Sequence, residues 1–211
     1  MAQQTITALY DRYEEASAAV SELEGNGIPH GDVSLVSNNE KDQHAGLLGG
    51  GHASTDTREK AKDGTGAGAT LGTLAGGAAG LLAGLGLIAI PGVGPVVAAG
   101  WLVATLTGAG IGAAAGGLAG ALTGAGVSEG DAHTYGEGVR RGGTLVTVRI
   151  DPARTGLAET VTAVLERHGA VDLDEKASAW RADGWTAPQA TVAGTAAGQG
   201  RVRTYPTTPG L

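Results

Sequence analysis

Residues 145–150 read Leu-Val-Thr-Val-Arg-Ile, a run of β-branched and alternating side chains that is typical of a β-strand. The dipeptide Asp-Pro at 151–152 follows it and favours a turn. Apolar side chains then recur at helical spacing from 157 to 165, and Gly169 suits the end of that helix. Residues 171–173 offer another strand, so this part of the chain predicts a strand, a helix and a strand in that order.

The beginning of the chain shows the same order of elements. Residues 5–9 predict a strand, residues 16–23 a helix, and residues 33–35 a second strand. The two helices also end alike, in Leu-Glu-Gly-Asn-Gly at 23–27 and Leu-Glu-Arg-His-Gly at 165–169. We therefore expect an α+β fold in which two halves of one ferredoxin-like βαββαβ sandwich form an internal repeat split by an insertion.

The composition between and after the two halves predicts the domain organisation. A polar, glycine-rich stretch is typical of a linker, and a final region rich in Ala, Thr, Gly and Pro favours flexibility. A capping-box spacing at 128–131 predicts one more short helix before the second half. The expected parts are residues 1–36, the first half of the ferredoxin-like domain; 37–63, a linker; 64–127, a glycine-zipper helical hairpin; 128–175, the second half; and 176–211, a flexible tail with Trp180, Trp185 and Tyr205 as docking points.

Between Asp63 and Glu129 the chain has no charged residue, and glycine recurs there at every fourth position. This spacing places the glycines on one stripe of a helix. The stretch from Pro91 to Pro95 breaks the segment and predicts two helical arms, at 66–90 and 96–126. The predicted helix-packing residues are Gly64, Gly68, Gly72, Gly76, Gly80 and Gly84 in the first series, and Gly100, Ala104, Gly108, Gly112, Gly116, Gly120 and Gly124 in the second.

A stripe of small residues favours contact between helices more clearly than it favours any chemistry. Glycine costs about 1 kcal/mol per helical site in water relative to alanine. Close approach of two backbones offsets that loss, as in the Gly-x-x-x-Gly pairs of membrane helices. We therefore expect a non-enzymatic structural protein whose main partner is itself, assembled into a homo-oligomer through the glycine zipper.

Two other functions stay open at this stage. The hairpin is long enough to enter a membrane, since each arm could span about 30 Å of hydrocarbon, although its many Gly and Thr residues oppose insertion. Membrane lipid is therefore a second candidate partner. Trp101, the one aromatic residue in this stretch, is either an interface anchor or a gap filler between helices. In the third hypothesis the ferredoxin-like sheet is a small-ligand or regulatory module.

Charge and residue types exclude several classes of function. The formal net charge is −7 without a basic stripe, which argues against nucleic acid as a partner. The chain has no cysteine, and no two of its histidines stand at helical metal-ligand spacing, so neither a metal nor another cofactor is expected. No Ser/His/Asp arrangement can be argued from spacing, so no catalytic residue is expected. The histidines are His30, His44, His52, His133 and His168, and an acidic run that we expect at a solvated strand end is Asp172, Asp174 and Glu175.

Several motifs resemble those of one bacterial family. They are Ala8-Leu9-Tyr10-Asp11, residues 16–20, Val33-Ser34-Leu35-Val36, Asp131-Ala132-His133 and the stretch at 142–148. Together with the glycine-rich hairpin they resemble the glycine-zipper members of the general-stress protein group, the heat-induced YflT-like family, over roughly residues 4–175. The resemblance implies a bacterial, stress-linked protein, and it brings no catalytic residues to carry over.

The flanks of the uncharged segment and the start of the chain bear on location. Residues 1–15 contain no basic and apolar leader, which argues against a secretory signal. Basic residues at 60, 62, 140 and 141 flank the hairpin, as expected on the cytoplasmic side of a membrane. We expect the protein in the bacterial cytoplasm or at the cytoplasmic face of the inner membrane.

Overall fold

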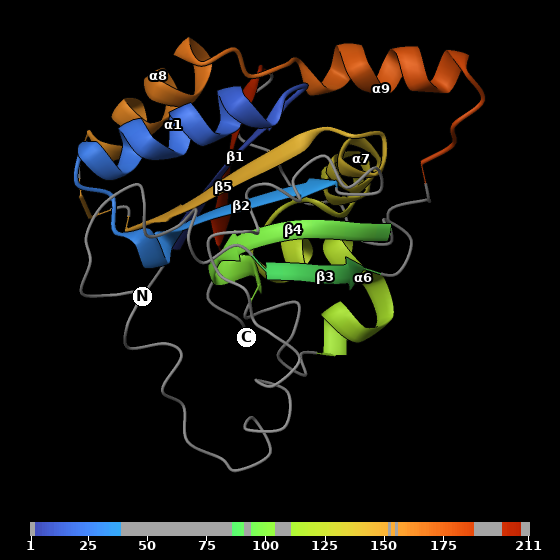
Figure 1. Cartoon of the computed structure of the whole chain (residues 1–211), viewed down its shortest axis with the longest axis horizontal. Helices are drawn as coiled ribbons and strands as arrows, with labels where there is room; N and C mark the ends of the chain where they lie inside the picture. Colours follow the sequence, from blue (N-terminus) through green and yellow to red (C-terminus); the bar gives the residue numbers. More distant parts are fainter. Residues whose placement is uncertain are drawn as a thin grey trace.

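The computed structural model describes residues 3–38, 86–90, 94–103, 111–151, 153–154, 156–187 and 200–207. These residues form an α+β fold in which helices cover a six-stranded antiparallel sheet (Figure 1). The strands are β1 Gln3–Tyr10, β2 Val33–Asn38, β3 Gly86–Ile90, β4 Gly94–Gly100, β5 Thr144–Ile150 and β6 Val202–Thr207, in the spatial order β3-β4-β2-β5-β1-β6. The helices are α1 Tyr13–Gly25, α6 Ile111–Gly124, α7 Glu129–Arg140, α8 Leu157–Arg167 and α9 Leu173–Ala182, with a short 3-10 turn at His30–Asp32. The α+β class expected from the sequence is confirmed.

The sheet separates two apolar cores. On one face, α1 and α8 lie side by side and pack on the strands (Figure 1). Their core includes Ile6, Tyr10, Val20, Leu23, Leu35, Val146, Val148, Val161 and Leu165. On the other face, α6, α7 and α9 enclose a second core that includes Leu9, Val36, Leu122, Tyr135, Val139, Leu145, Trp180 and Tyr205. Side chains alternate between the two cores along β1 and β5, as the period of two in their sequences requires.

The short helix expected after the insertion is confirmed as α7. Ser128 is its N-cap, and its side-chain oxygen accepts a hydrogen bond from the backbone nitrogen of Asp131 at 3.2 Å. Such a cap satisfies one of the backbone donors that the first turn of a helix leaves free. The cap fixes where α7 begins, and Asp131 thereby comes to lie on its first turn.

The insertion differs from the predicted helical hairpin at residues 86–90 and 94–100. Residues 86–90 and 94–100 are strands, joined antiparallel so that Ile90 lies opposite Gly94. The β4 strand pairs with β2 from Ser34↔Gly100 to Asn38↔Val96. A glycine at every fourth position fits a helix, but this part is also rich in Ile and Val, which favour strands. The open edge of β2 satisfies the backbone groups of β4, so tertiary pairing outweighs the helical spacing.

The predicted flexible tail is wrong for residues 176–187 and 200–207. The first stretch continues α9, whose N-cap Asp172 accepts hydrogen bonds from the backbone nitrogens of Asp174 at 2.9 Å and Glu175 at 3.1 Å. The second stretch contains β6, which pairs with β1. The strand predicted at 171–173 is reduced to one bridge between Val171 and Leu9, since α9 begins at Leu173.

Candidate functional site

The predicted helix-packing residues do not lie on one continuous helix. Gly64, Gly68, Gly72, Gly76, Gly80, Gly84, Ala104 and Gly108 lie outside the described residues, Gly100 ends β4, and Gly112, Gly116, Gly120 and Gly124 are on α6. Helix α6 is interrupted at Gly117, where φ is 55° and ψ is −133°. The four glycines of the series that lie on α6 therefore fall on two helical pieces, two before the kink and two after it.

Gly100 has a role that its place in the series did not predict. Its φ is +87°, a conformation that favours glycine. A Cβ built on Gly100 would lie 2.0 Å from the backbone oxygen of Val33 and 2.8 Å from the Cα of Ser34. The close contact that requires a glycine is thus between β4 and β2 of one sheet.

Trp101 packs inside the protein. Its residue surface is 8% exposed, and it belongs to the core between the sheet and α6. The Cζ atom of Arg149 lies 4.3 Å from the centroid of the indole ring, within the range of a cation–π contact. Burial lowers the pKa of Arg149, and the nearby charge of Asp32 opposes that shift. Trp101 is thus buried between the sheet and a helix, which is a different place from the gap between two helices that the sequence suggested.

The most connected polar cluster joins β6 to the helices. Arg203 on β6 has a side chain that is only 6% exposed. Its Nη1 donates to Oδ1 of Asp131 on α7 at 2.5 Å, and its Nη2 lies 2.6 Å from Oδ2 of Asp174 on α9. Burial opposes the charge of Arg203, but the hydrogen bond to Asp174 and the charge of Asp131 outweigh it, so the pKa of Arg203 is raised. One guanidinium thus connects a strand with two helices.

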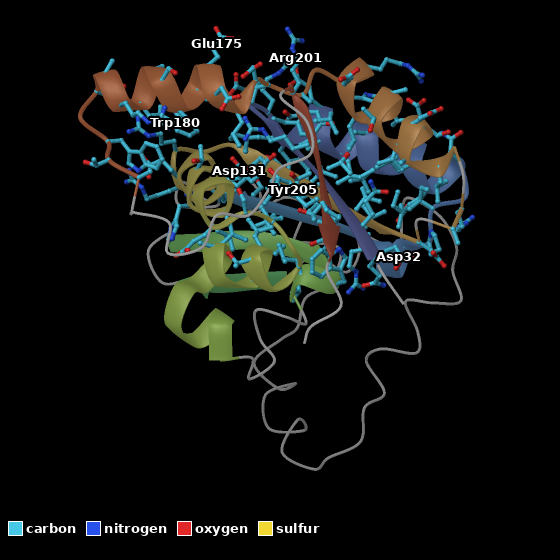
Figure 2. All side chains as sticks on the ribbon, turned by 180° about the vertical axis from the view of Figure 1, so that it is seen from behind. Asp32, Asp131, Glu175, Trp180, Arg201 and Tyr205 are labelled. Carbon is cyan, nitrogen blue, oxygen red and sulfur yellow. The ribbon has the colours of Figure 1, made fainter. Side chains whose placement is uncertain are left out.

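Three hydroxyl groups lie next to this cluster, between the sheet and α7. Tyr205, which lies beside Asp131 (Figure 2), donates from its hydroxyl to Oδ2 of Asp131 at 2.9 Å. Thr7 donates to the hydroxyl of Tyr135 at 2.8 Å. Tyr135 lies close to this cluster, so the charges of Arg203 and Asp131 both reach its hydroxyl. Burial raises the pKa of Tyr135 to about 12 and raises that of Tyr205 even further. We call Thr7, Asp131, Tyr135, Asp174, Arg203 and Tyr205 the β6 latch.

The register of the sheet explains why these groups meet. On β1, Thr7 lies opposite Arg203 of β6, and Thr5 lies opposite Tyr205. Residues two apart on a strand share one face, so Arg203 and Tyr205 both turn toward α7. Asp131 reaches both of them from the first turn of that helix. Asp131 and Asp174 therefore hold the side chains of Arg203 and Tyr205 on β6.

A second, smaller charged cluster lies at the other end of α7. Glu137 is 6% exposed at its side chain and accepts from Nε of Arg140 at 2.7 Å and from Nε of Arg141 at 2.5 Å. Burial disfavours the ionised form of Glu137, but these two hydrogen bonds outweigh it and lower its pKa. The Cζ of Arg141 also lies 5.4 Å from the ring centroid of Trp180. This cluster fastens the end of α7 to α9.

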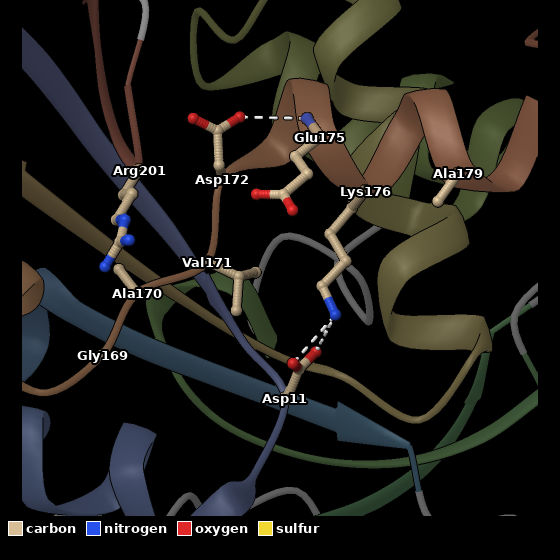
Figure 3. A pocket seen from close by; sticks show the side chains of 9 residues that line it. All are labelled: Asp11, Gly169, Ala170, Val171, Asp172, Glu175, Lys176, Ala179 and Arg201. Atoms are coloured by element: carbon tan, nitrogen blue, oxygen red, sulfur yellow. Dashed lines mark hydrogen bonds and ion pairs between the residues drawn. The ribbon is translucent and has the colours of Figure 1, made fainter.

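A cleft of about 400 Å³ opens beside the latch, between the end of β1 and α9 (Figure 3). Lys176 and Arg201 stand on opposite sides of it, and Lys176 forms an ion pair with Asp11 at 2.8 Å. Its lining residues are Asp11, Gly169, Ala170, Val171, Asp172, Glu175, Lys176, Ala179 and Arg201. The predicted solvated run of acidic residues contributes Asp172 and Glu175 to this cleft, while Asp174 belongs to the latch.

Three of the histidines lie among the described residues, on α7 (His133), at His30 and at His168, and the last two each pair with one carboxylate. Nδ1 of His30 lies 3.0 Å from Glu24, and Nε2 of His168 lies 2.7 Å from Glu22. Within the part of the chain that the structure describes, no three His, Asp or Glu side chains are grouped so that they could hold a metal ion. Over the same residues, no helix combines the length and the apolar character needed to cross a bilayer. His44 and His52 lie outside the described ranges.

The sequence patterns did not predict the latch, although they indicate the strand and the helix start that contribute to it. Residues 202–205 read Val-Arg-Thr-Tyr, which has the composition of a strand, and Asp172 stands three residues before Glu175 at capping-box spacing. The pairing of Asp131 with Arg203 joins residues 72 positions apart. Comparison of the chain with protein-family models, with curated proteins and with solved structures finds no match.

Proposed function

We propose that this protein is a structural, non-enzymatic protein that assembles with copies of itself through the uncharged segment 64–127. The observation that carries the proposal is the position of β3, at the edge of the sheet. Its sequence, Gly-Leu-Ile-Ala-Ile, is apolar throughout. Edge strands usually carry lysine, proline or a bulge that prevents pairing with another chain, and β3 contains no lysine or proline. Backbone pairing between the β3 strands of two copies would satisfy this edge.

Symmetry supports an assembly of this kind. Two identical edge strands that pair antiparallel are related by a two-fold axis, which is the commonest symmetry of homo-oligomers. We propose that the glycine series outside the described residues provides further contacts between copies, by close approach of backbones. The acidic α/β body, with a net charge of −7 for the chain, would then cover the outside of the assembly and keep it in solution.

We further propose that β1, α1, β2, β5, α8 and β6 together form a ferredoxin-like unit. The spatial order β2-β5-β1-β6 supports this, because each neighbouring pair is antiparallel and each helix connects two strands that have a third strand between them. On this proposal β6, which follows α9 in the chain, takes the place of the fourth strand that the sequence suggested at 171–173. The β3–β4 hairpin would then be the part of the insertion that extends the unit.

From the resemblance to the general-stress family, we propose that the assembly lies in the bacterial cytoplasm or at the cytoplasmic face of the inner membrane. A membrane-associated form, in which the part of the uncharged segment outside the described residues enters lipid, is the alternative. The two differ in one respect: a lipid-embedded segment requires detergent for extraction, whereas a water-soluble assembly does not.

The test adds one charge to the β3 edge and measures particle size. Ile88→Lys places a lysine on the edge strand, and Ala18→Lys adds the same charge on the exposed face of α1 as a matched control. We expect sedimentation velocity in detergent-free buffer to give smaller particles for Ile88→Lys, with the control and the unmodified chain unchanged. Gly76→Leu and Gly116→Leu should also reduce particle size if the glycines pack between copies. Equal particle size for the unmodified chain, Ile88→Lys and both glycine variants would refute the proposal.

A second function, the binding of a small ligand, is favoured by the cleft of about 400 Å³. A volume of this size suits a small molecule, and Arg201 and Lys176 could hold an anionic group at its rim. The test is a thermal-shift screen of small carboxylates and phosphates against the unmodified chain and Arg201→Gln. A ligand that stabilises the first and not the second would support this function, and no stabilisation by any anion would count against it.

A further inference from the structure

We propose that the cleft beside α9 binds a small zwitterion, a molecule that carries one carboxylate and one ammonium group, as a free amino acid does. The inference rests on the second function proposed above, because it names the class of ligand for the same cleft. Arg201 holds the carboxylate and Glu175 holds the ammonium group, from opposite sides of the cleft (Figure 3).

Two charged side chains of this cleft are without a protein partner. Arg201 is exposed and directly precedes β6, and Glu175 is exposed in the first turn of α9. Within the described part of the chain, neither side chain takes part in a hydrogen bond or an ion pair. Their opposite charges would attract each other at close range, and the cleft keeps them apart. A ligand that carries both charges can pair with the two side chains together.

The other charged side chains of the cleft are already in use. Lys176 forms an ion pair with Asp11 at 2.8 Å, so the charge of its ammonium group is balanced within the chain. Asp172 is the N-cap of α9, and its Oδ1 accepts hydrogen bonds from two backbone nitrogens of the first turn. These contacts fix one wall of the cleft and leave Arg201 and Glu175 for the ligand.

The balance of charge favours a zwitterion over a simple anion or a simple cation. Three carboxylates and two basic side chains line the cleft, so its formal charge is −1. A simple anion meets this net negative charge, and a simple cation leaves Arg201 without a partner. A zwitterion adds no net charge and brings an opposite charge to each wall, where attraction across a short distance is favourable even near a protein surface.

The size and the floor of the cleft suit a small organic molecule. Its volume of about 400 Å³ lies within the range of roughly 300–1,000 Å³ that is usual for small-ligand sites. Val171 is half-buried between the two walls (Figure 3), and its backbone nitrogen donates to the oxygen of Leu9 at 2.8 Å. Ala170, beside it, is buried. This short apolar floor between two charged groups matches the carbon chain that separates the two charges of an amino acid.

The test compares ligands that carry both charges with ligands of the same carbon number that carry one. The zwitterionic probes are glycine, γ-aminobutyrate and ε-aminocaproate, which differ in the distance between their charges. Each is matched with its alkanoate and its alkylamine. Binding to the full-length chain is followed by thermal shift against ligand concentration, at one protein concentration and at constant ionic strength, because salt screens exposed charges. We expect at least one zwitterion to reach half-saturation at a concentration at least tenfold below those of both its matched ligands.

Substitutions on the two walls identify the groups that bind. Arg201→Gln and Glu175→Gln should each raise the half-saturating concentration of that zwitterion at least tenfold. Arg181→Gln and Glu159→Gln are the matched controls, because they remove the same charges at exposed positions outside the cleft. Both controls should bind the zwitterion as the unmodified chain does.

The outcomes separate this inference from the functions on which it builds. An alkanoate that binds as tightly as its zwitterion, and loses binding in Arg201→Gln, would overturn the zwitterion and leave an anion site standing. An alkylamine that binds as tightly as its zwitterion would overturn it as well. Absence of binding by every probe would overturn it whatever the screen of carboxylates and phosphates finds. Self-assembly is independent of all these outcomes, because it is measured by particle size.

Discussion

The two carboxylates that share Arg203 allow a sharp test of the latch, because Asp131 is the less exposed of the two and also accepts from the hydroxyl of Tyr205. The side chain of Asp131 is 16% exposed, and that of Asp174 is 66% exposed. Asp131→Asn keeps the size of the side chain but removes the charged acceptor from a guanidinium that is itself 6% exposed. A hydrogen bond to a charged group contributes about 1.5–3 kcal/mol, and a surface ion pair contributes about 0–1 kcal/mol.

We therefore expect Asp131→Asn to lower the free energy of unfolding by about 2–3 kcal/mol and Asp174→Asn to lower it by less than about 1 kcal/mol. For a chain of this length, 1 kcal/mol corresponds to a shift of about 2–4 °C in Tm. The assay is urea unfolding followed by tryptophan fluorescence, at one fixed protein concentration because association alters apparent stability. Equal losses for the two variants, or a larger loss for Asp174→Asn, would refute the assignment of Asp131 as the principal anchor of β6.

Three further predictions concern acid, alkali and glycine. The pKa of Glu137 is lowered in the folded protein, so its carboxylate stabilises the fold fully above its unfolded pKa, and this stabilisation is lost as pH falls through its folded pKa. Glu137→Gln should therefore destabilise the protein at neutral pH and destabilise it less in acid. A loss of stability that stays the same or grows in acid contradicts this. All four tyrosines have raised pKa values, that of Tyr135 being about 12, so tyrosinate absorbance should not appear near pH 10 in the folded protein. The free energy of unfolding should fall as pH rises above 10. Tyrosinate absorbance near pH 10 would show that the tyrosine hydroxyls are exposed to solvent, against this prediction. Gly100→Ala should lower the free energy of unfolding in urea by more than about 1–3 kcal/mol, because the added Cβ would meet the backbone of Val33. Gly124→Ala should leave the free energy of unfolding unchanged, because the space around Gly124 is open. Equal effects of the two substitutions would contradict the close contact at Gly100.

Local sequence patterns predicted the elements whose apolar side chains recur with a clear period of two or of 3.6. The alternation at 145–150 and the helical spacing at 157–165 correspond to β5 and α8, and β1, α1 and β2 followed from the same two periods. These segments each bury one continuous apolar face, and that property is written in the sequence at short range.

The missed elements depend on partners far away in the chain. Strand β4 needs the edge of β2, where Ser34 pairs with Gly100, and the glycine spacing of the segment is equally compatible with a helix. Strand β6 needs the edge of β1, nearly the whole chain away, and its own six residues are too few to distinguish it from a tail. The latch required the same long-range information, because no local pattern indicates that Asp131 meets Arg203.

The central claim is that copies of this chain associate without lipid. The most direct test is the molar mass of the purified, unmodified chain, measured by light scattering in detergent-free buffer over a series of dilutions. The proposal predicts a mass that is a multiple of that of one chain and that falls only at the lowest concentrations. The mass of a single chain at every concentration, or material that dissolves only with detergent, would contradict it.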